Sequence, residues 1–225
     1  MFGVVKTTCM RLGADLLCPH YCRFCGVLGR VLCERCRKYM VLNVESLCLE
    51  CGEVARGGVC RYCRLPFWAG WMVGYRDEPV GVLAEEYKFE SVRVLGRELA
   101  ELLDTRLPCL GNVSVVPVPT SREHVRARGV DHSRVIAREL ARLRGWKCED
   151  KLVMRRHESA QTGVARRERI LQAAEGFEVR GECENKNYLV VDDIWTTGAT
   201  LKNICIVLRN AGAKRVDVAV LARSR

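Results

Sequence analysis

Residues 188–201 read YLVVDDIWTTGATL, a stretch in which two adjacent acids follow an apolar run and precede a threonine-rich tract. Its apolar run is typical of a strand in the middle of a parallel sheet and leads into Asp192 and Asp193. Adjacent carboxylates repel each other, and burying them is costly unless something compensates their charge. A helix cap needs only one acid and explains neither the second nor the threonines that follow. The pattern therefore favours a ligand that presents hydroxyls or a metal ion to the two acids.

The tract after the acids, residues 196–200, has the composition of a phosphate-binding loop. It leads into a predicted helix, whose first N–H groups and dipole favour an anion. It is not a Walker loop, because Gly-Lys-Ser/Thr is missing and Lys202 falls inside the helix. Two acids can accept hydrogen bonds from vicinal hydroxyls, and the loop beside them can bind a phosphate. This combination is the pattern of a ribose 5-phosphate site. Its predicted residues are Asp192, Asp193, Thr196, Thr197, Gly198, Ala199 and Thr200.

The surrounding chain alternates predicted helices and strands. Helices are predicted over residues 79–103 (in two pieces broken near Ser91), 131–143 and 200–211, and strands over 113–118, 188–192 and 216–221. This order predicts an α/β fold in which a parallel sheet carries helices on both faces. Such sheets bind ligands at the carboxyl ends of their strands, where the two acids lie.

Composition narrows the function classes. The 225 residues allow one ordinary domain plus a small module, and the net charge of +10 favours an anionic partner such as a nucleotide, nucleic acid or membrane surface. Solubility alone is the other explanation of the charge. No run of 18 apolar residues predicts a membrane span, and charged residues interrupt the first 20 residues, which argues against a secretory signal. We therefore expect a cytoplasmic protein with reduced thiols.

Cysteines are concentrated near the N-terminus, where ten of the 14 lie between Cys9 and Cys63. Eight of them form four Cys-x-x-Cys pairs in two similar units about 26 residues apart. We call residues 22–36 the first unit and residues 48–63 the second unit. The predicted metal ligands are Cys22, Cys25, Cys33, Cys36, Cys48, Cys51, Cys60 and Cys63.

Two such pairs complete a tetrahedral site, so the units predict about two structural zinc ions with no open position for water. Iron–sulfur clusters usually show a more clustered spacing. We prefer one ion per unit, with interleaved pairing as the alternative. The predicted domains are a double zinc ribbon over residues 1–66 and an α/β domain over residues 67–225.

The stretch VVDDIWTTGAT resembles the phosphoribosyl pyrophosphate (PRPP) motif of type I phosphoribosyltransferases. Nearly the whole chain, from Cys22 to Arg223, resembles the ComF competence proteins, in which a double zinc ribbon precedes a phosphoribosyltransferase-like domain. Where that family commonly reads Arg-Gly-Phe-Asn-Gln, this chain has Arg128-Gly129-Val130-Asp131-His132. The matching segments are the Cys pairs, Tyr87-Lys88-Phe89, Pro117-Val118-Pro119, Arg128-Gly129, QTGVARRER at residues 161–169, the Asp-Asp motif and Leu221-Ala222-Arg223.

The resemblance implies roles for individual residues. Asp192 and Asp193 would hold the ribose hydroxyls and act as the catalytic carboxylates, residues 196–200 would bind the 5-phosphate, and Mg²⁺ would bind with PRPP. The loop after Val118 would face pyrophosphate, and residues 161–169 would form a hood over the sugar, although their arginines also suit a solvated face. The predicted pyrophosphate and hood residues are Lys88, Arg122, Arg126, Arg128, Gln161, Arg166 and Arg169.

The family resemblance also implies a role in DNA uptake during natural transformation. The protein would bind single-stranded DNA and work with a DNA translocase on the cytoplasmic side, with peripheral attachment to the inner membrane face as a further option. The alternative is a true phosphoribosyltransferase of nucleotide metabolism or salvage. Whether the chain is an enzyme is left open.

Overall fold

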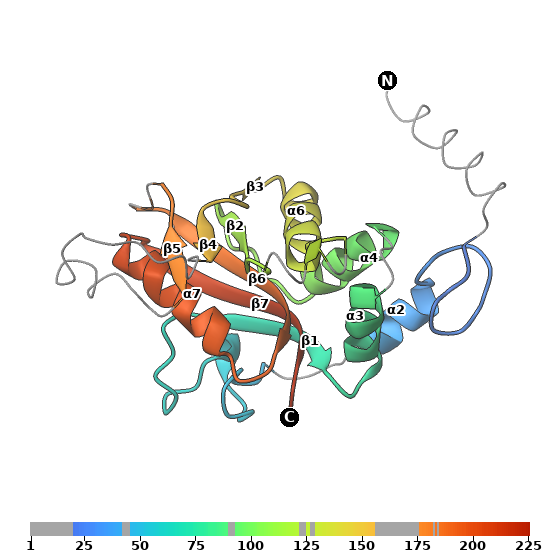
Figure 1. Ribbon diagram of the computed structural model, residues 1–225. Coiled ribbons are helices and arrows are strands. Elements are labelled where there is room, and N and C mark those ends of the chain that lie inside the picture. The colour runs from blue at the N-terminus through green and yellow to red at the C-terminus, as the bar shows by residue number, and fades with distance from the viewer. Residues whose placement is uncertain are drawn as a thin grey trace, which may run out of the picture.

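A five-stranded parallel sheet lies at the centre of the described chain, with the strand order β1-β7-β6-β2-β3 (Figure 1). We describe a computed structural model, which covers residues 20–41, 46–89, 93–121, 125–126, 129–155, 176–181, 183 and 185–225. The two long middle strands, β6 and β7, contain continuous buried apolar runs at residues 188–191 and 218–222, as expected for strands covered on both faces. The strands of this sheet are β1 (Gly70–Tyr75), β2 (Ser114–Pro117), β3 (Lys147–Cys148), β6 (Asn187–Trp195) and β7 (Arg215–Arg223).

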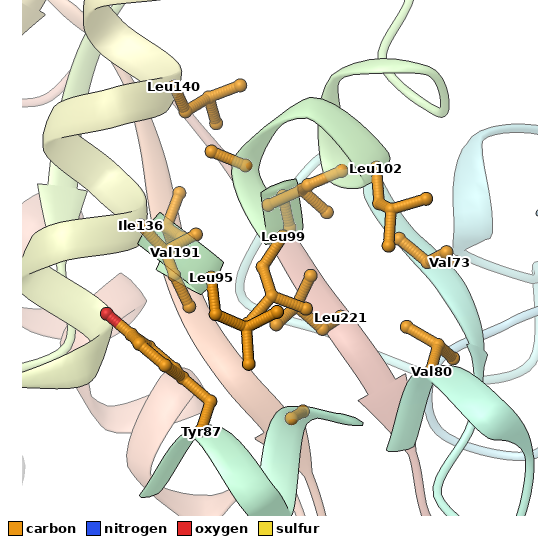
Figure 2. Packing of buried hydrophobic residues seen from close by; sticks show 14 of the residues in the cluster. Val73, Val80, Tyr87, Leu95, Leu99, Leu102, Ile136, Leu140, Val191 and Leu221 are labelled. Carbon is orange, nitrogen blue, oxygen red and sulfur yellow. The ribbon is translucent and has the colours of Figure 1, made fainter. Parts of the chain in front are cut away.

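Helices cover both faces of the sheet, as predicted. Helices α3 (Pro79–Phe89), α4 (Arg93–Asp104) and α6 (His132–Arg144) pack on one face, and α7 (Ala199–Asn210) packs on the other (Figure 1). Figure 2 shows the first interface, where Leu95, Leu99 and Ile136 meet Val191 and Leu221 from the two middle strands. These helices confirm the α/β class. Helices α3 and α4 lie on either side of the predicted break near Ser91, which falls outside the described residues.

Three features of the sheet differ from the prediction, and the first is the short strand β3, which was not predicted. Strand β6 does not end at Asp192 but continues to Trp195, because its last residues still pair with β7 through Ile194↔Ala222 and Trp195↔Arg223. Strand β1 was not predicted. Its sequence GWMVGY has glycines and no clear alternation, and it forms by pairing with β7, as in Met72↔Val220. Pairing with a long, buried neighbour outweighs weak strand propensity here.

A separate antiparallel pair, β4 (Val153–Arg155) and β5 (Phe177–Val179), flanks residues 156–175, which lie outside the described residues. The predicted hood segment, with Gln161, Arg166 and Arg169, falls in this range. None of the helices that the structure describes is long and apolar enough to cross a membrane.

The two cysteine units share a backbone pattern that repeats every 26 residues. In each unit the N–H of the first cysteine donates across the turn. Cys22 donates to the Val27 carbonyl and Cys48 to the Glu53 carbonyl, both at 2.8 Å. Short bridges close each turn, Tyr21↔Leu28 in the first unit and Leu47↔Val54 in the second. The units then diverge, because the first continues into helix α2 (Glu34–Met40) and the second into a 3-10 turn, η1 (Arg56–Gly58).

Candidate functional site

The two acids lie on β6 just beyond the point where its neighbour β2 ends. The last β2–β6 pair is Pro117↔Val191, so Asp192 and Asp193 have no strand partner on the β2 side. They lie at the carboxyl end of the sheet and are half-buried. The Ser133 hydroxyl at the start of α6 donates to Asp192 Oδ1 across 2.9 Å. Asp193 Oδ1 accepts the N–H of Ile194 at 2.7 Å. The strand and the first turn of α6 together therefore fix the orientation of the acids.

Ser133 is a site residue that sequence reasoning missed. It directly follows His132, which ends the segment in which this chain departs from the common family pattern. Asp131 caps α6 by accepting the N–H of Arg134 at 3.3 Å, and it also accepts the Thr120 hydroxyl at 3.0 Å. Thr120, in the loop after β2, and Asp192 therefore both contact the N-terminal end of α6. The cap geometry was readable from Asp131, but the Ser133–Asp192 contact was not.

Tyr87 lies behind the acids in the core. Its ring meets that of His132 edge-on with centroids 4.6 Å apart, and its hydroxyl is buried without a partner among the described residues. Burial raises the pKa of Tyr87, and the carboxylates of Asp131 and Asp193 raise it further. The phenol therefore stays neutral and packs as a core group beneath the site.

The phosphate loop, residues 196–200, wraps around the buried Trp195. Gly198 has a φ of 69° and caps α7, and a Cβ there would lie 2.0 Å from Trp195 Cζ2. Only glycine fits this position without displacing the indole. The Trp195 ring packs edge-on against Phe67 at 5.9 Å. Thr196 and Thr197 stay exposed, so their hydroxyls are open to an anion at the start of the helix.

Most of the predicted pyrophosphate and hood residues cannot be placed at this site. Arg126 is described and is exposed, and Lys88 lies in α3 but its side chain is outside the described residues. A cation that the prediction omitted does contact the loop after β2: Arg155 donates from Nε to the Pro119 carbonyl at 2.8 Å. The predicted residues outside the described part of the chain are Arg122, Arg128, Gln161, Arg166 and Arg169.

The eight paired thiols form two separate groups that could each hold a metal ion, one per unit, with ligand atoms within 4.8 Å of one another. A tetrahedral zinc site with Zn–S bonds of about 2.3 Å places its sulfurs about 3.8 Å apart. The Sγ atoms of Cys25 and Cys33 lie 3.6 Å apart, and those of Cys51 and Cys60 lie 3.7 Å apart. The donor set and the spacing therefore fit zinc, with the sequential grouping that we preferred.

Local hydrogen bonds prepare these thiols as ligands. The N–H of Cys63 donates to Cys60 Sγ at 3.3 Å and lowers the pKa of that thiol to about 7. In the first unit the N–H of Cys33 donates to Cys22 Sγ at 3.4 Å. A thiolate is the form that binds a metal ion, and these bonds favour it at Cys22 and Cys60. Burial raises the pKa of Cys36, and hydrogen bonds from neighbouring thiols raise the pKa of Cys63 to about 12.

Each unit packs on a different part of the α/β domain. The first unit lies against α4, where Arg37 of α2 pairs with Glu98 and, at 2.8 Å, with Glu101. The second unit lies against the ends of β7 and α7, close to the phosphate loop. There Arg223 donates to the carbonyl of Leu49 at 2.8 Å, and Lys202 donates to Glu50 at 2.7 Å.

Comparison with known proteins agrees with this geometry. The model of the phosphoribosyl transferase domain matches residues 125–225, which include the acids and the phosphate loop. The fold class predicted from the sequence is confirmed.

Similarity extends beyond the phosphoribosyl transferase domain to nearly the whole chain. Competence protein F of Haemophilus influenzae is 26% identical over 213 residues, which cover 86% of this chain and 90% of that protein. Competence protein ComFC of Streptococcus pneumoniae is 27% identical over 85% of this chain and 87% of its own length. DNA utilization protein YhgH of Salmonella typhi is 28% identical over 86% of this chain and 97% of its own. Together with the two four-cysteine groups, these relatives confirm the predicted resemblance to the ComF competence proteins.

Proposed function

We propose that this chain binds PRPP or a related ribose 5-phosphate with Mg²⁺ and acts in DNA uptake. The observation that carries the proposal is the half-buried acid pair on β6, just beyond the end of β2, next to a hydroxyl-rich loop at the start of α7. In this proposal Asp192 and Asp193 hold the ribose hydroxyls, and residues 196–200 hold the 5-phosphate. The chain then consists of a zinc ribbon module up to residue 66 and the ligand-binding domain from residue 67.

Magnesium suits this donor set, because hard cations prefer carboxylate and phosphate oxygens. When bound with PRPP, it would neutralise charge on the pyrophosphate group. The chain's own carboxylates would favour the positive charge that develops at the anomeric carbon as pyrophosphate leaves. Ser133 and the strand backbone hold these carboxylates in place, so no reorganisation is needed as that charge appears.

The proposed role in DNA uptake draws on the names of the relatives, which refer to competence and DNA utilization. Exposed aromatic rings on both cysteine units also support single-stranded DNA as the partner, because bases stack on such rings. Phe24 and Tyr39 form a pair 5.9 Å apart on the first unit, and Arg61 lies over the exposed Tyr62 ring of the second at 4.7 Å. We place this activity in the cytoplasm, beside a DNA translocase.

Calorimetric titration of the zinc-loaded protein with PRPP and Mg²⁺ tests the ligand site. We expect binding by the wild type and a loss of about tenfold or more in the double variant Asp192→Asn, Asp193→Asn, since hydrogen bonds to charged groups are stronger than neutral ones. Asp77→Asn is the matched control, because Asp77 is an exposed acid paired with Arg225. Unchanged affinity in the double variant would refute the assignment of the acids.

The phosphoribosyl transferase domain also supports a second function, a true phosphoribosyltransferase of nucleotide metabolism or salvage. The two functions separate experimentally. Release of pyrophosphate that requires a nucleobase or amine would favour the enzyme. Binding of a single-stranded oligonucleotide that falls steeply with salt and weakens in Phe24→Ala, Tyr39→Ala would favour the role in DNA uptake.

A further inference from the structure

We propose that the second unit is a positioning element of the phosphate loop, so that its metal ion controls the order of that loop. This inference deepens the proposed function, because the loop is the predicted 5-phosphate cradle. It assigns a role to Arg223, Lys202 and Glu50, which lie outside the motif itself.

The first link is Arg223, the last residue of β7 and only 9% exposed. Its guanidinium donates from Nε to the Leu49 carbonyl at 2.8 Å and from Nη2 to the Glu50 carbonyl at 2.9 Å. Leu49 and Glu50 are the two residues between Cys48 and Cys51, so these carbonyls belong to the metal-binding turn itself. A closed turn presents both acceptors together, and the metal ion keeps the turn closed.

Gly52 completes this contact. Its φ of 80° continues the turn after Cys51, and a Cβ built there would lie 3.3 Å from Arg223 Nη1. Gly26 holds the same place in the first unit with a φ of 72°, yet its Cβ would meet no atom within 4 Å. The two glycines share a backbone requirement, but only Gly52 also makes room for a cation from the sheet.

The second link is the ion pair between Glu50 and Lys202. Both carboxylate oxygens of Glu50 lie within reach of Lys202 Nζ, at 2.7 and 2.6 Å. The same ammonium donates to the Thr197 carbonyl at 3.3 Å and lies 5.6 Å from the centre of the Trp195 ring. Lys202 therefore bridges the metal-binding turn to the backbone of the phosphate loop and to the indole under it.

The third link runs through the end of the sheet. The N–H of Ser224, next to Arg223, donates to the Trp195 carbonyl at 2.8 Å. Leu49 is fully buried in the same apolar cluster as Phe67 and Trp195. The turn of the second unit thus contacts the loop through an ion pair, through the β7 end and through apolar packing. Opening the turn would release all three contacts at once.

Hydrogen exchange of the loop amides, followed by mass spectrometry, measures this coupling without any ligand. We compare the zinc-loaded wild type with Cys51→Ser, Cys60→Ser in the second unit and with the equivalent pair Cys25→Ser, Cys33→Ser in the first. The second-unit variant should exchange about tenfold faster over residues 196–202, because local opening sets the exchange rate. The first-unit variant should leave those amides as in the wild type, and an equal rise in both variants would overturn the proposal.

A second variant keeps all eight cysteines. Glu50→Gln removes the charge that holds Lys202, and we expect about threefold faster exchange of the same amides with both zinc ions retained. Glu53→Gln, an exposed acid three residues later in the same unit, is the matched control and should change nothing. No change in Glu50→Gln beyond that control would refute the bridge through Lys202.

Adding ribose 5-phosphate to the wild type separates this inference from the proposed function. If ribose 5-phosphate slows exchange of the loop amides but the second-unit variants do not speed it, the coupling is refuted and the ligand site stands. If the variants loosen the loop and neither ribose 5-phosphate nor PRPP protects it, the coupling stands and the proposed ligand is wrong. By linkage, ligand binding should also slow zinc release to a chelator from the second unit, and Glu50→Gln should weaken that effect.

Discussion

The two cysteine units have nearly the same spacing and the same hydrogen-bonded turn, yet they pack in different places. The first unit contributes Leu32, and the helix α2 that continues it contributes Met40, to the apolar cluster of α3, α4 and α6. Figure 1 shows α2 beside α3, well away from α7. The second unit contributes Leu49 to the cluster that contains Trp195 and α7. The comparison teaches that the repeat specifies how a metal is held, whereas the residues around the cysteines decide what each metal site supports.

Metal removal should have the largest effect. Structural zinc sites contribute folding free energy directly, with apparent binding of about 10 kcal/mol or more in small domains. We expect two zinc ions per chain and a loss of more than about 5 kcal/mol in the free energy of unfolding when a chelator removes both. Elemental analysis and urea denaturation with and without chelator check this. One ion or none per chain would break the comparison between the units.

Truncating one buried leucine in each unit should have an intermediate effect. Leu32 and Leu49 are both fully buried, and Leu→Ala changes at such positions cost about 2–5 kcal/mol. We expect a similar loss of stability in Leu32→Ala and Leu49→Ala, measured by urea denaturation. Only Leu49→Ala should also speed exchange in the phosphate loop, since Leu32 packs on the other face of the sheet. Faster loop exchange in both variants would mean that both units, and not only the second, affect the order of the phosphate loop.

Removing the ion pair that docks the first unit should have the smallest effect. Burial raises the pKa of Glu98 and Arg37 opposes that rise, so Arg37→Gln leaves a buried carboxylate without its main partner. We expect a loss of about 1–3 kcal/mol at neutral pH. The difference from the wild type should shrink as the pH falls and Glu98 becomes protonated, because only the ionised carboxylate needs Arg37.

Urea denaturation of the wild type and Arg37→Gln between pH 4 and 7 measures this difference. Arg142→Gln is the control, because Arg142 forms an exposed pair with Glu139 on α6. A difference that grows toward acid pH would contradict the assigned role of Arg37.

Much of the fold could be predicted because its signals are local. The apolar run of β6 and the amphipathic pattern of α6 each depend on a few adjacent residues. Strand β1 was missed because its stability comes from β7, 148 residues later, as in Gly70↔Val218. The extension of β6 to Trp195 was missed for the same reason. Pairing with a neighbour is a property of the sheet rather than of the strand.

The candidate site divides in the same way. The acids, the phosphate loop and the cysteine ligands were predicted because each motif consists of residues that lie close together in the sequence, at a spacing that its chemistry requires. Ser133 was missed, since nothing near it in the sequence indicates an acid from a distant strand. Arg155 was missed because its partner is a backbone carbonyl, which leaves no sequence signal. Side chains that hold a site in place are therefore the hardest to predict.

By itself, the sequence determined the α/β class, the acid pair before a phosphate-type loop and two four-cysteine units. Short spacings fix these features, because a turn or a strand brings near neighbours together in any context. Only the tertiary structure decided that the second unit contacts the phosphate loop. Lys202 and Glu50 are 152 residues apart, and Arg223 and Leu49 are 174 apart. Such contacts depend on how the parallel sheet orders its strands and on where each strand ends, which no local pattern records.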